Sequence, residues 1–195
     1  MKSVISKRLT SLFLGLASLG IFQTSAIAQA DTYPNRPIKL IITWPVGGFA
    51  DTLGRTVANQ LGPILGQQIV VENRGGANGM IGADAVAKAA PDGYTLMLDA
   101  SSFSANPALY PKLPYDSLKA FKPIGVVALF PNVVLVNSNF SAKNVNDLIA
   151  TAGKAKESVS YASSGNGSAQ HLAGALFESA AKVDMVHVPY KGGGP

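Results

Sequence analysis

Apolar residues along the chain fall into two alternating patterns, short β-branched runs and longer stretches that repeat every four residues. A short apolar run bounded by Gly, Pro, Asn or Asp indicates a strand covered on both faces. The runs predict strands at 38–43, 69–72, 95–98, 124–129, 133–136, 159–162 and 185–188. Because predicted helices lie between several of these strands, the pattern predicts an α/β fold with parallel-rich sheets flanked by helices.

Four helices are predicted from apolar residues that repeat on one face. The first carries Leu53, Val57 and Leu61, the second Ile81, Ala85 and Ala89, the third Leu148, Ile149 and Ala152, and the last Leu172, Leu176 and Ala180. The third helix is expected to begin near Asn146. These apolar faces are expected to pack on the sheets.

The segment 121–136 differs because two strand-like runs follow one another with only Phe130, Pro131 and Asn132 between them. Proline is poorly tolerated inside a central strand, which favours a hinge-like crossing between two lobes over one continuous strand. An edge hairpin is the alternative. We therefore expect a first lobe at 29–130 and part of a second lobe at 131–195.

Residues 1–28 have the pattern of a cleaved secretory signal peptide. Lys2, Lys7 and Arg8 precede an apolar stretch from Leu9 to Phe22, and small residues at 26–28 suit a signal peptidase. A membrane anchor is the alternative, but the apolar stretch is shorter than the roughly 20 residues needed to span a bilayer. The leader predicts export, and a bacterial periplasm fits best.

Charge and cysteine content exclude several classes of protein. Three of the sixteen basic residues lie in the leader, so the remaining thirteen exceed the eleven acidic residues by only two. These cations are scattered and form no basic run interleaved with aromatics, so nucleic-acid binding is not expected. The chain has no cysteine, which leaves neither a lipid-attachment site nor a disulfide framework.

The first candidate site is the loop that follows the first predicted strand. Gly47 and Gly48 let the backbone approach a ligand closely, and the helix that follows presents unpaired N–H groups and its positive dipole end. Phe49 is expected either to cover the pocket or to pack in the core, and Ala50 to contribute its backbone. Asp51 is expected to cap the helix rather than touch an anion, because two carboxylates repel each other.

A second candidate loop, 99–106, follows the third strand of the first lobe, where the carboxyl ends of parallel strands normally meet a ligand. Ser101, Ser102 and Ser104 carry hydroxyl groups that can donate hydrogen bonds, although serines also simply populate loops. Phe103 and Phe49 are expected to line the cleft and set selectivity.

In the second lobe the run 163–168 repeats the design of the first glycine loop and opens a helix. We expect a ligand carboxylate on the Gly47–Asp51 loop and the ligand's other end in this run. The expected ligand contacts are Ser163, Ser164, Gly165, Gly167, Ser168 and His171. Tyr190 and Lys191 follow the last strand, and Lys191 is either a charge partner for a carboxylate or a solvated lysine.

Catalytic and metal-binding interpretations have little support. A triad of Ser164 or Ser168 with His171 would need a nucleophile elbow of the form G-x-S-x-G, whereas the loop reads Gly-Asn-Gly-Ser-Ala. His187 has no cysteine or paired carboxylate at ligand spacing, so no metal is expected. Neither a dinucleotide-binding nor a P-loop glycine motif is present. We expect no catalytic residue and no cofactor.

Several motifs, in order, resemble the substrate-binding proteins of tripartite tricarboxylate transporters, the TctC or Bug family. The motifs are Trp44-Pro-Val-Gly-Gly-Phe-Ala-Asp51, the glycine-rich stretch 66–79, the Ala-Pro-Asp-Gly-Tyr-Thr element at 90–95 and the closing His187-Val-Pro-Tyr-Lys-Gly192. The resemblance runs from about Tyr33 to Pro195 and implies a two-lobed periplasmic binding protein (type II) fold. Because family members continue well past the last motif, it also implies a chain truncated within its second lobe.

The resemblance implies a periplasmic receptor, expected as a monomer, that closes on a small carboxylate and hands it to the membrane permease subunits of the transporter. The implied ligands are di- and tricarboxylates, acidic amino acids and aromatic acids. A ligand sensor that feeds a sensor kinase is the alternative, and a secreted α/β hydrolase is a weaker one.

Overall fold

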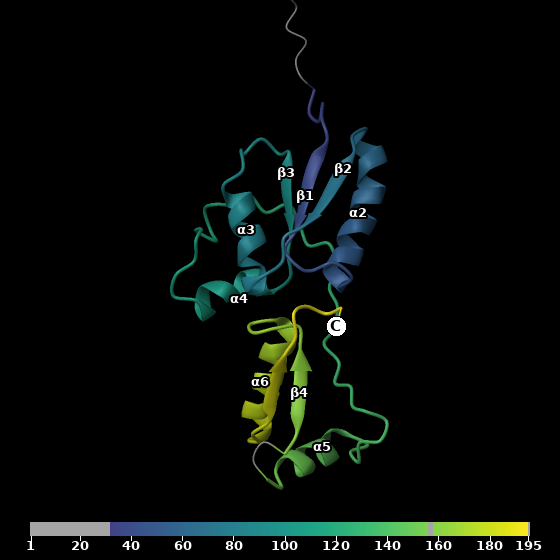
Figure 1. Cartoon of the computed structure of the whole chain (residues 1–195), viewed down its shortest axis with the longest axis vertical. Helices are drawn as coiled ribbons and strands as arrows, with labels where there is room; N and C mark the ends of the chain where they lie inside the picture. Colours follow the sequence, from purple (N-terminus) through teal and green to yellow (C-terminus); the bar gives the residue numbers. More distant parts are fainter. Residues whose placement is uncertain (1–31, 156–157, 195) are drawn as a thin grey trace, which may run out of the picture. The chain divides into compact units, whose positions relative to one another are not determined.

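The computed structural model describes residues 32–155 and 158–194, so the predicted leader at 1–28 lies outside the described residues. The described part contains two separate sheets (Figure 1). The first is formed by β1 (Ile38–Ile42), β2 (Ile69–Asn73) and β3 (Thr95–Leu98), and the second by β4 (Ser160–Ser163) and β5 (Val186–Pro189). All pairings are parallel, as the alternating pattern predicts.

The strand order in the first sheet is β2-β1-β3, which places the most apolar strand in the centre. Ile38 pairs with Ile69, and Ile42 pairs with both Asn73 and Leu98. Parallel pairing brings the carboxyl ends of all three strands to one edge, and the loops that follow β1 and β3 begin there.

Two helices cover opposite faces of this sheet. A Cβ added to Gly54 of α2 (Phe49–Leu65) would lie 2.5 Å from Cδ1 of Ile42, and one added to Gly82 of α3 (Met80–Ala87) would lie 3.0 Å from Cγ2 of Thr43. Because Ile42 and Thr43 are adjacent, their side chains point to opposite faces. The predicted flanking of the sheet by helices is confirmed.

On α2 and α3 the most buried residues differ from the predicted ones, although Leu61 of α2 packs against the first core as expected. On α2 the buried residues are Asp51, Gly54, Ala58 and Gly62, while the predicted Leu53, Val57 and Leu61 are only partly buried. On α3 the buried residues are Gly82 and Ala83; Ile81 is exposed and Ala89 lies beyond the helix. Small residues let each helix backbone lie close to the sheet, so the large side chains pack at the edges of the contact.

In the second lobe, α5 (Val145–Ala152) begins one residue before the predicted start near Asn146. Its N-cap is Asn144, whose side chain accepts a hydrogen bond from the backbone N–H of Asp147, and this satisfies one of the unpaired donors of the first turn. A small core lies beneath it. This core contains Ala142, Leu148, Ala152, Val159 and Val183.

Helix α6 (Ala169–Ala181) packs against β4 and β5 by a different face from the predicted one. Leu176 is exposed, whereas Phe177 and Ala181 pack on the second core. A Cβ on Gly174 would lie 2.2 Å from the ring of Tyr161, so the helix meets β4 through a glycine.

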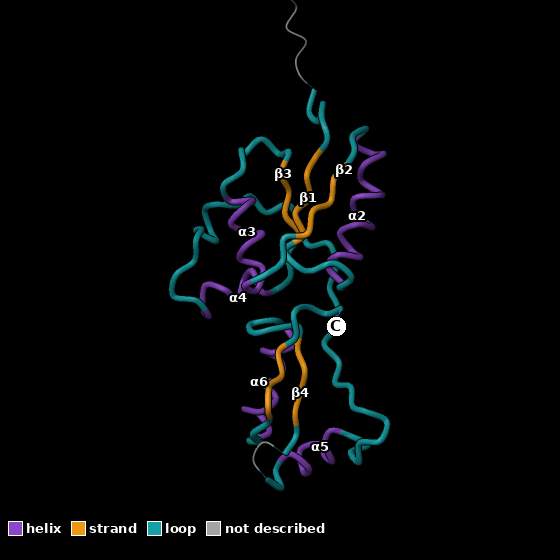
Figure 2. Tube along the Cα trace, in the orientation of Figure 1, coloured by secondary structure: helices purple, strands orange, loops and turns teal. Residues whose placement is uncertain are grey.

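The predicted strands at 124–129 and 133–136 are wrong for this structure. The segment 121–136 is extended but belongs to no described sheet, and Figure 2 draws it as loop. Its apolar side chains, including Ile124, Leu129 and Leu135, are exposed. β-propensity describes how well a side chain fits a paired, half-covered surface, and a strand forms only where another strand accepts its hydrogen bonds.

The predicted loop at 99–106 is helical over most of its length. Helix α4 (Ser102–Leu109) begins four residues after the end of β3, and a short 3-10 turn, η2 (Ala77–Gly79), precedes α3. Among the described residues, none of the helices is long and apolar enough to cross a membrane.

Candidate functional site

The loop between β1 and α2 combines a left-handed glycine with an uncapped helix start. Gly47 has φ of 84°, a conformation that other residues rarely adopt, and Gly48 is the N-cap with φ of −81°. Gly48 has no side chain to cap the helix, and the first N–H groups of an α-helix have no intrahelical partner. The loop therefore presents backbone donors at the edge where the strands end.

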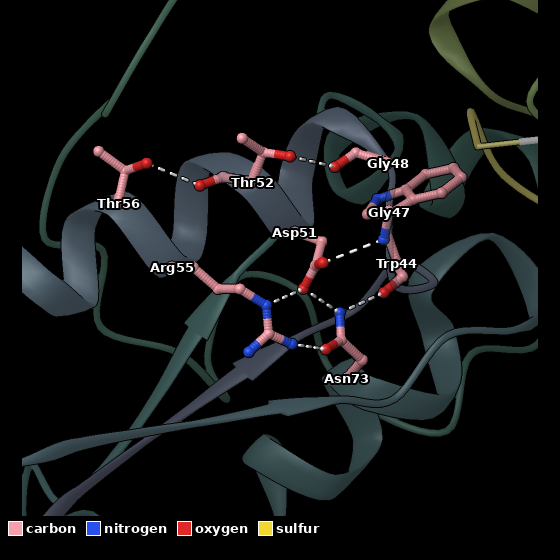
Figure 3. A network of polar contacts seen from close by, with 8 residues as sticks. All are labelled: Trp44, Gly47, Gly48, Asp51, Thr52, Arg55, Thr56 and Asn73. Atoms are coloured by element: carbon pink, nitrogen blue, oxygen red, sulfur yellow. Dashed lines mark hydrogen bonds and ion pairs between the residues drawn. The ribbon is translucent and has the colours of Figure 1, made fainter.

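Asp51 holds this loop in place from the first turn of α2 (Figure 3). Its Oδ2 accepts a hydrogen bond from the Gly47 N–H at 3.0 Å, and its Oδ1 accepts from Arg55 Nε and Asn73 Nδ2, both at 2.9 Å. Asn73, at the end of β2, also donates to the Trp44 carbonyl at 3.0 Å and accepts from Arg55 Nη2 at 2.9 Å. The network ties the loop to the neighbouring strand.

The charge of Asp51 is stabilised by these donors. The Gly47 N–H, followed by Arg55 and Asn73, holds the pKa of the Asp51 carboxyl below its ordinary value, while burial opposes this shift. Asp51 lies in the first turn, as expected, but it bonds the residue before the N-cap rather than the helix N–H groups. Because Gly47 already donates to Asp51, the loop donors left for a ligand are the N–H groups of 48–50.

Phe49 and Ala50 differ in burial: the Phe49 side chain is exposed and the Ala50 side chain is partly buried. Phe49 is exposed, with its ring centroid 4.5 Å from that of Phe130 in the extended segment, so it does not pack in the core. Ala50 packs partly against the first core. Its side chain therefore faces inward.

The serines after β3 have distinct positions. Ser101 is exposed and precedes α4, whereas Ser102 is buried and donates through Oγ to Asp99 Oδ1 at 3.3 Å. Ser104 donates to the Ser101 carbonyl at 2.8 Å. Phe103 makes an edge contact with Phe121, at 5.1 Å between ring centroids.

Asp99 is a residue of this region that sequence reasoning did not single out. Its Oδ1 also accepts hydrogen bonds from the Trp44 indole and from the Ala100 N–H. Burial raises the pKa of the Asp99 carboxyl, although hydrogen bonds from Thr43 and these donors oppose the shift. A lone carboxylate after a strand gives no signal in sequence that it will be buried.

The second glycine loop, between β4 and α6, is held by hydroxyl and imidazole groups. Ser168 is the buried N-cap of α6 and accepts from the His171 N–H at 3.3 Å. Gly167 donates its N–H to His171 Nδ1 at 3.0 Å, which requires an unprotonated Nδ1. Ser164 donates to Gln170 Oε1 at 2.8 Å, and Gly165 has φ of 133°.

Three rings stack behind this loop. The ring centroids of His171 and His187 lie 4.0 Å apart, and those of His187 and Tyr161 lie 5.0 Å apart. His187 Nε2 lies 2.7 Å from the Oγ of Ser163, a contact that sequence reasoning missed because the two residues are far apart in the chain. Burial, followed by the charge of His171, lowers the pKa of His187, while Glu178 opposes the shift.

The Ser163–His187 contact does not have the arrangement of a hydrolase. Ser163 is 6% exposed, and its Oγ also accepts the Gly165 N–H at 3.1 Å. Within the described residues no carboxylate bonds the remaining ring nitrogen of His187, and Glu178 instead accepts from Tyr161 and the Met185 N–H. The geometry orders the loop rather than activating a nucleophile.

A pocket of about 280 Å³ opens beside the second loop. It is lined by Ala162, Ser163, Ser164, Gln170, Tyr190, Gly192 and Gly193. Tyr190 and Gly192 donate their N–H groups to the carbonyls of Ser163 and Ser164, which holds the closing motif along the loop. Lys191 is exposed and is not among the lining residues.

A larger pocket, of about 380 Å³, lies at the opposite end of α2, around Gly62 and Gly66. None of the predicted site residues lines it, so we place the candidate site at the two glycine loops. In the part of the chain that the structure describes, no cluster of His, Asp and Glu is arranged to hold a metal ion.

The α/β fold is that of periplasmic binding proteins. Residues 53–195 match the family described as the tripartite tricarboxylate transporter family receptor, TctC. The chain therefore belongs to this family, which confirms the resemblance drawn from its motifs. The family is one of substrate-binding proteins.

Named relatives agree with this assignment. Protein BugT of Bordetella pertussis is 41% identical over 186 residues, which cover 92% of this chain and 57% of BugT. The solved MatC (Rpa3494) from Rhodopseudomonas palustris with bound malate is 32% identical, with a TM-score of 0.76, over 84% of this chain and 56% of MatC. R. palustris Rpa4515 with adipate is 35% identical, with a TM-score of 0.78, over 82% of this chain and 54% of Rpa4515.

The chain spans about half the length of the relatives it matches. This partial coverage agrees with an incomplete second lobe.

Proposed function

We propose that this protein is the periplasmic receptor of a tripartite tricarboxylate-type transporter and that it binds a small carboxylate without chemical turnover. The observation that carries the proposal is that two solved relatives of the same fold, at 32% and 35% identity, were determined with the dicarboxylates malate and adipate. Membrane permease subunits of such a transporter would receive the ligand. Export by a signal peptide at 1–28 would place the receptor in the periplasm.

In the proposed binding mode, one ligand carboxylate lies on the N–H groups of Gly48, Phe49 and Ala50. Helix N-termini favour anions through both unpaired donors and the helix dipole. The Asp51 network supports this mode because it holds the loop rigid from behind, with its charge neutralised by Arg55 and hydrogen bonds. The second-lobe loop, through Ser164, Gly165 and the pocket beside them, would hold the other end of the ligand.

Polar neutral donors suit a receptor that must release its ligand. Hydrogen bonds from backbone N–H groups and hydroxyls hold a carboxylate without a buried ion pair that has to be broken. The exposed Phe49 and the Phe103 cluster are the side chains that we propose set selectivity among dicarboxylates, acidic amino acids and aromatic acids.

The test is a thermal-shift screen against malate, adipate and other carboxylates, each paired with its amide. A bound carboxylate at a hundred times its Kd stabilises the folded protein by about 2.7 kcal/mol, so Tm rises with the acid and not with the amide. A folded protein whose Tm does not change with any carboxylate would contradict the proposal.

The loop itself is tested by Gly48→Val. A Cβ on Gly48 meets no atom closer than 3.7 Å and the backbone φ is ordinary, so the variant is expected to fold. Its branched side chain blocks the approach of a carboxylate to the N–H groups and should abolish the Tm rise. Ile64→Val, on the exposed far half of α2, is the matched control and should keep it. Normal affinity in Gly48→Val would remove this loop from the site.

A further inference from the structure

Asp99 joins the two loops that leave the first sheet. One atom, its Oδ1, accepts hydrogen bonds from Trp44 Nε1 at 3.0 Å, from the Ala100 N–H at 2.7 Å and from Ser102 Oγ at 3.3 Å. Trp44 belongs to the loop after β1, whereas Ala100 and Ser102 lie at the start of α4. A single carboxyl oxygen therefore connects the carboxyl ends of two neighbouring strands.

The second oxygen of Asp99 has no such partners. Oδ2 is buried and accepts no well-formed hydrogen bond within the described residues, because the Thr43 hydroxyl, which also acts on the pKa of Asp99, donates to the Leu98 carbonyl. It lies against Gly79, where an added Cβ would be 3.0 Å from it, and Gly79 has φ of 88°. Leaving a buried acceptor of an ionised carboxylate unsatisfied costs free energy.

We propose that Asp99 is a positioning residue: it fixes the Trp44 loop to the start of α4, sets the first-lobe side of the carboxylate site and presents a neutral group to the anionic ligand. This inference rests on the proposed function for its ligand, but its geometry stands on the hydrogen bonds above.

A proton on Oδ2 would let this oxygen make a hydrogen bond that it otherwise lacks. Thr43 Oγ1 lies 3.5 Å from the Leu98 carbonyl and has only one hydrogen to donate, so it cannot serve both that carbonyl and an ionised Asp99. When Asp99 is protonated, Oδ2 donates to Thr43 Oγ1, which donates in turn to Leu98. Burial, which raises the pKa of Asp99, favours the same protonated state.

Tyr115 is the titratable group whose electrostatics couple it to Asp99. Tyr115 lies near it, and the pKa of Tyr115 is raised first by burial and then by the charges of Asp99 and of Asp84 on α3. An ionised Asp99 would also repel a ligand carboxylate on the adjoining loop.

The first experiment uses Trp44, the single tryptophan of the chain, as a reporter. Trp44 fluorescence is followed from pH 3 to 9 without ligand. A neutral Asp99 at pH 7 predicts a transition only above pH 7, well above the ordinary range of an aspartate, and Asp99→Asn should lack it. A transition that is complete below pH 7 would overturn the neutral role. Asp92→Asn, which changes an exposed acid paired with Arg36, is the control and should keep the transition. An unchanged transition in Asp99→Asn would overturn the proposal.

The second experiment measures the affinity for malate and adipate at pH 7. Asn keeps an acceptor at Oδ1 and places a donor at the position of the protonated oxygen, so Asp99→Asn should bind within about threefold of the unaltered protein. Asp99→Ala removes the link and should lose about tenfold. If Asp99→Ala fails to fold, Trp44→Phe removes the indole donor instead and should show the same loss.

Equal losses in Asp99→Asn and Asp99→Ala would overturn the neutral positioning role. If the unaltered protein binds no carboxylate, the proposed function fails and so does the ligand part of this inference. The fluorescence experiment then still decides whether a neutral Asp99 anchors Trp44, because it needs no ligand.

Discussion

The two glycine loops of this protein share one backbone plan and differ in the chemistry that holds them. In the first lobe a charged centre holds the loop, with Asp51 bonded to Gly47, Arg55 and Asn73. In the second lobe hydroxyl and imidazole groups hold the loop. The Ser163 hydroxyl is hydrogen-bonded to the His187 ring, and the Gly167 N–H donates to His171 Nδ1. The backbone plan provides donors for an anion, and the side chains behind it only have to keep the loop in place.

In both lobes the neighbouring strand takes part in holding the loop. Asn73 ends β2, which pairs with β1, and His187 lies in β5, which pairs with β4. Parallel pairing places the end of one strand beside the loop that leaves the next strand. In each lobe the sheet therefore positions the glycine loop, although different side chains hold the two loops in place.

The largest expected effect is in the charged centre. Asp51→Ala removes a buried carboxylate that accepts three hydrogen bonds, and we expect it to lower the free energy of unfolding by about 3 kcal/mol. Urea unfolding followed by Trp44 fluorescence measures this. Asp92→Asn, in an exposed pair with Arg36, is the control and should cost about 0.5 kcal/mol or less. Equal effects of the two variants would show that the Asp51 network does not hold the loop.

A smaller effect is expected in the neutral centre. Ser168→Ala removes the cap on the His171 N–H and should lower stability by about 1 kcal/mol, a typical value for a lost N-cap. Amide hydrogen exchange of α6 is the measurement. Ser179→Ala, near the other end of the same helix, is the matched control and should change protection little. A loss as large as that of Asp51→Ala would remove the contrast between the two centres.

The smallest expected effect is a pH dependence of stability that differs between the two loops. It is small because His187 is only partly buried. Its pKa is lowered in the folded state, so the unfolded chain takes up the proton first and stability falls as pH decreases below about 6.5. The pKa of Asp51 is also lowered, but its contribution is fully present above about pH 4 and is lost only as pH falls through its folded pKa.

Hydrogen exchange at pH 7 and pH 5 checks this difference. Protection near His187 in β5 should decrease at pH 5. Protection at the start of α2 should not decrease, because Asp51 stays ionised at this pH. In His187→Gln the decrease in β5 should disappear. A decrease that persists in this variant would assign the pH dependence to another group.

The first sheet was predictable from sequence because its strands are apolar runs with clear boundaries. β1 and β2 agree with the predicted strands to within one residue at their ends, and β3 agrees at both ends. The run at 124–129 has the same composition, yet it is unpaired. Composition reports that a segment suits a strand, whereas pairing depends on another backbone that the local sequence does not contain.

The candidate site was only partly predictable. Glycines before a helix start identify a loop with free backbone donors, so the positions of Gly47, Gly48, Gly165 and Gly167 follow from local pattern. The roles of Asp99 and His187 do not, because their partners are far away in the chain. Whether the predicted residues contact a ligand remains a proposal that the affinity measurements address.

By itself the sequence determined the class of fold, the two glycine loops and the family, since these depend on local periodicity and on short motifs in order. Only the tertiary structure decided which faces of α2, α3 and α6 are buried, that Asp51 accepts the Gly47 N–H, and that Asp99 and His187 lie behind the loops. The physical reason is that burial and hydrogen bonding are properties of pairs of residues, and the chain brings these pairs together only when the sheets form.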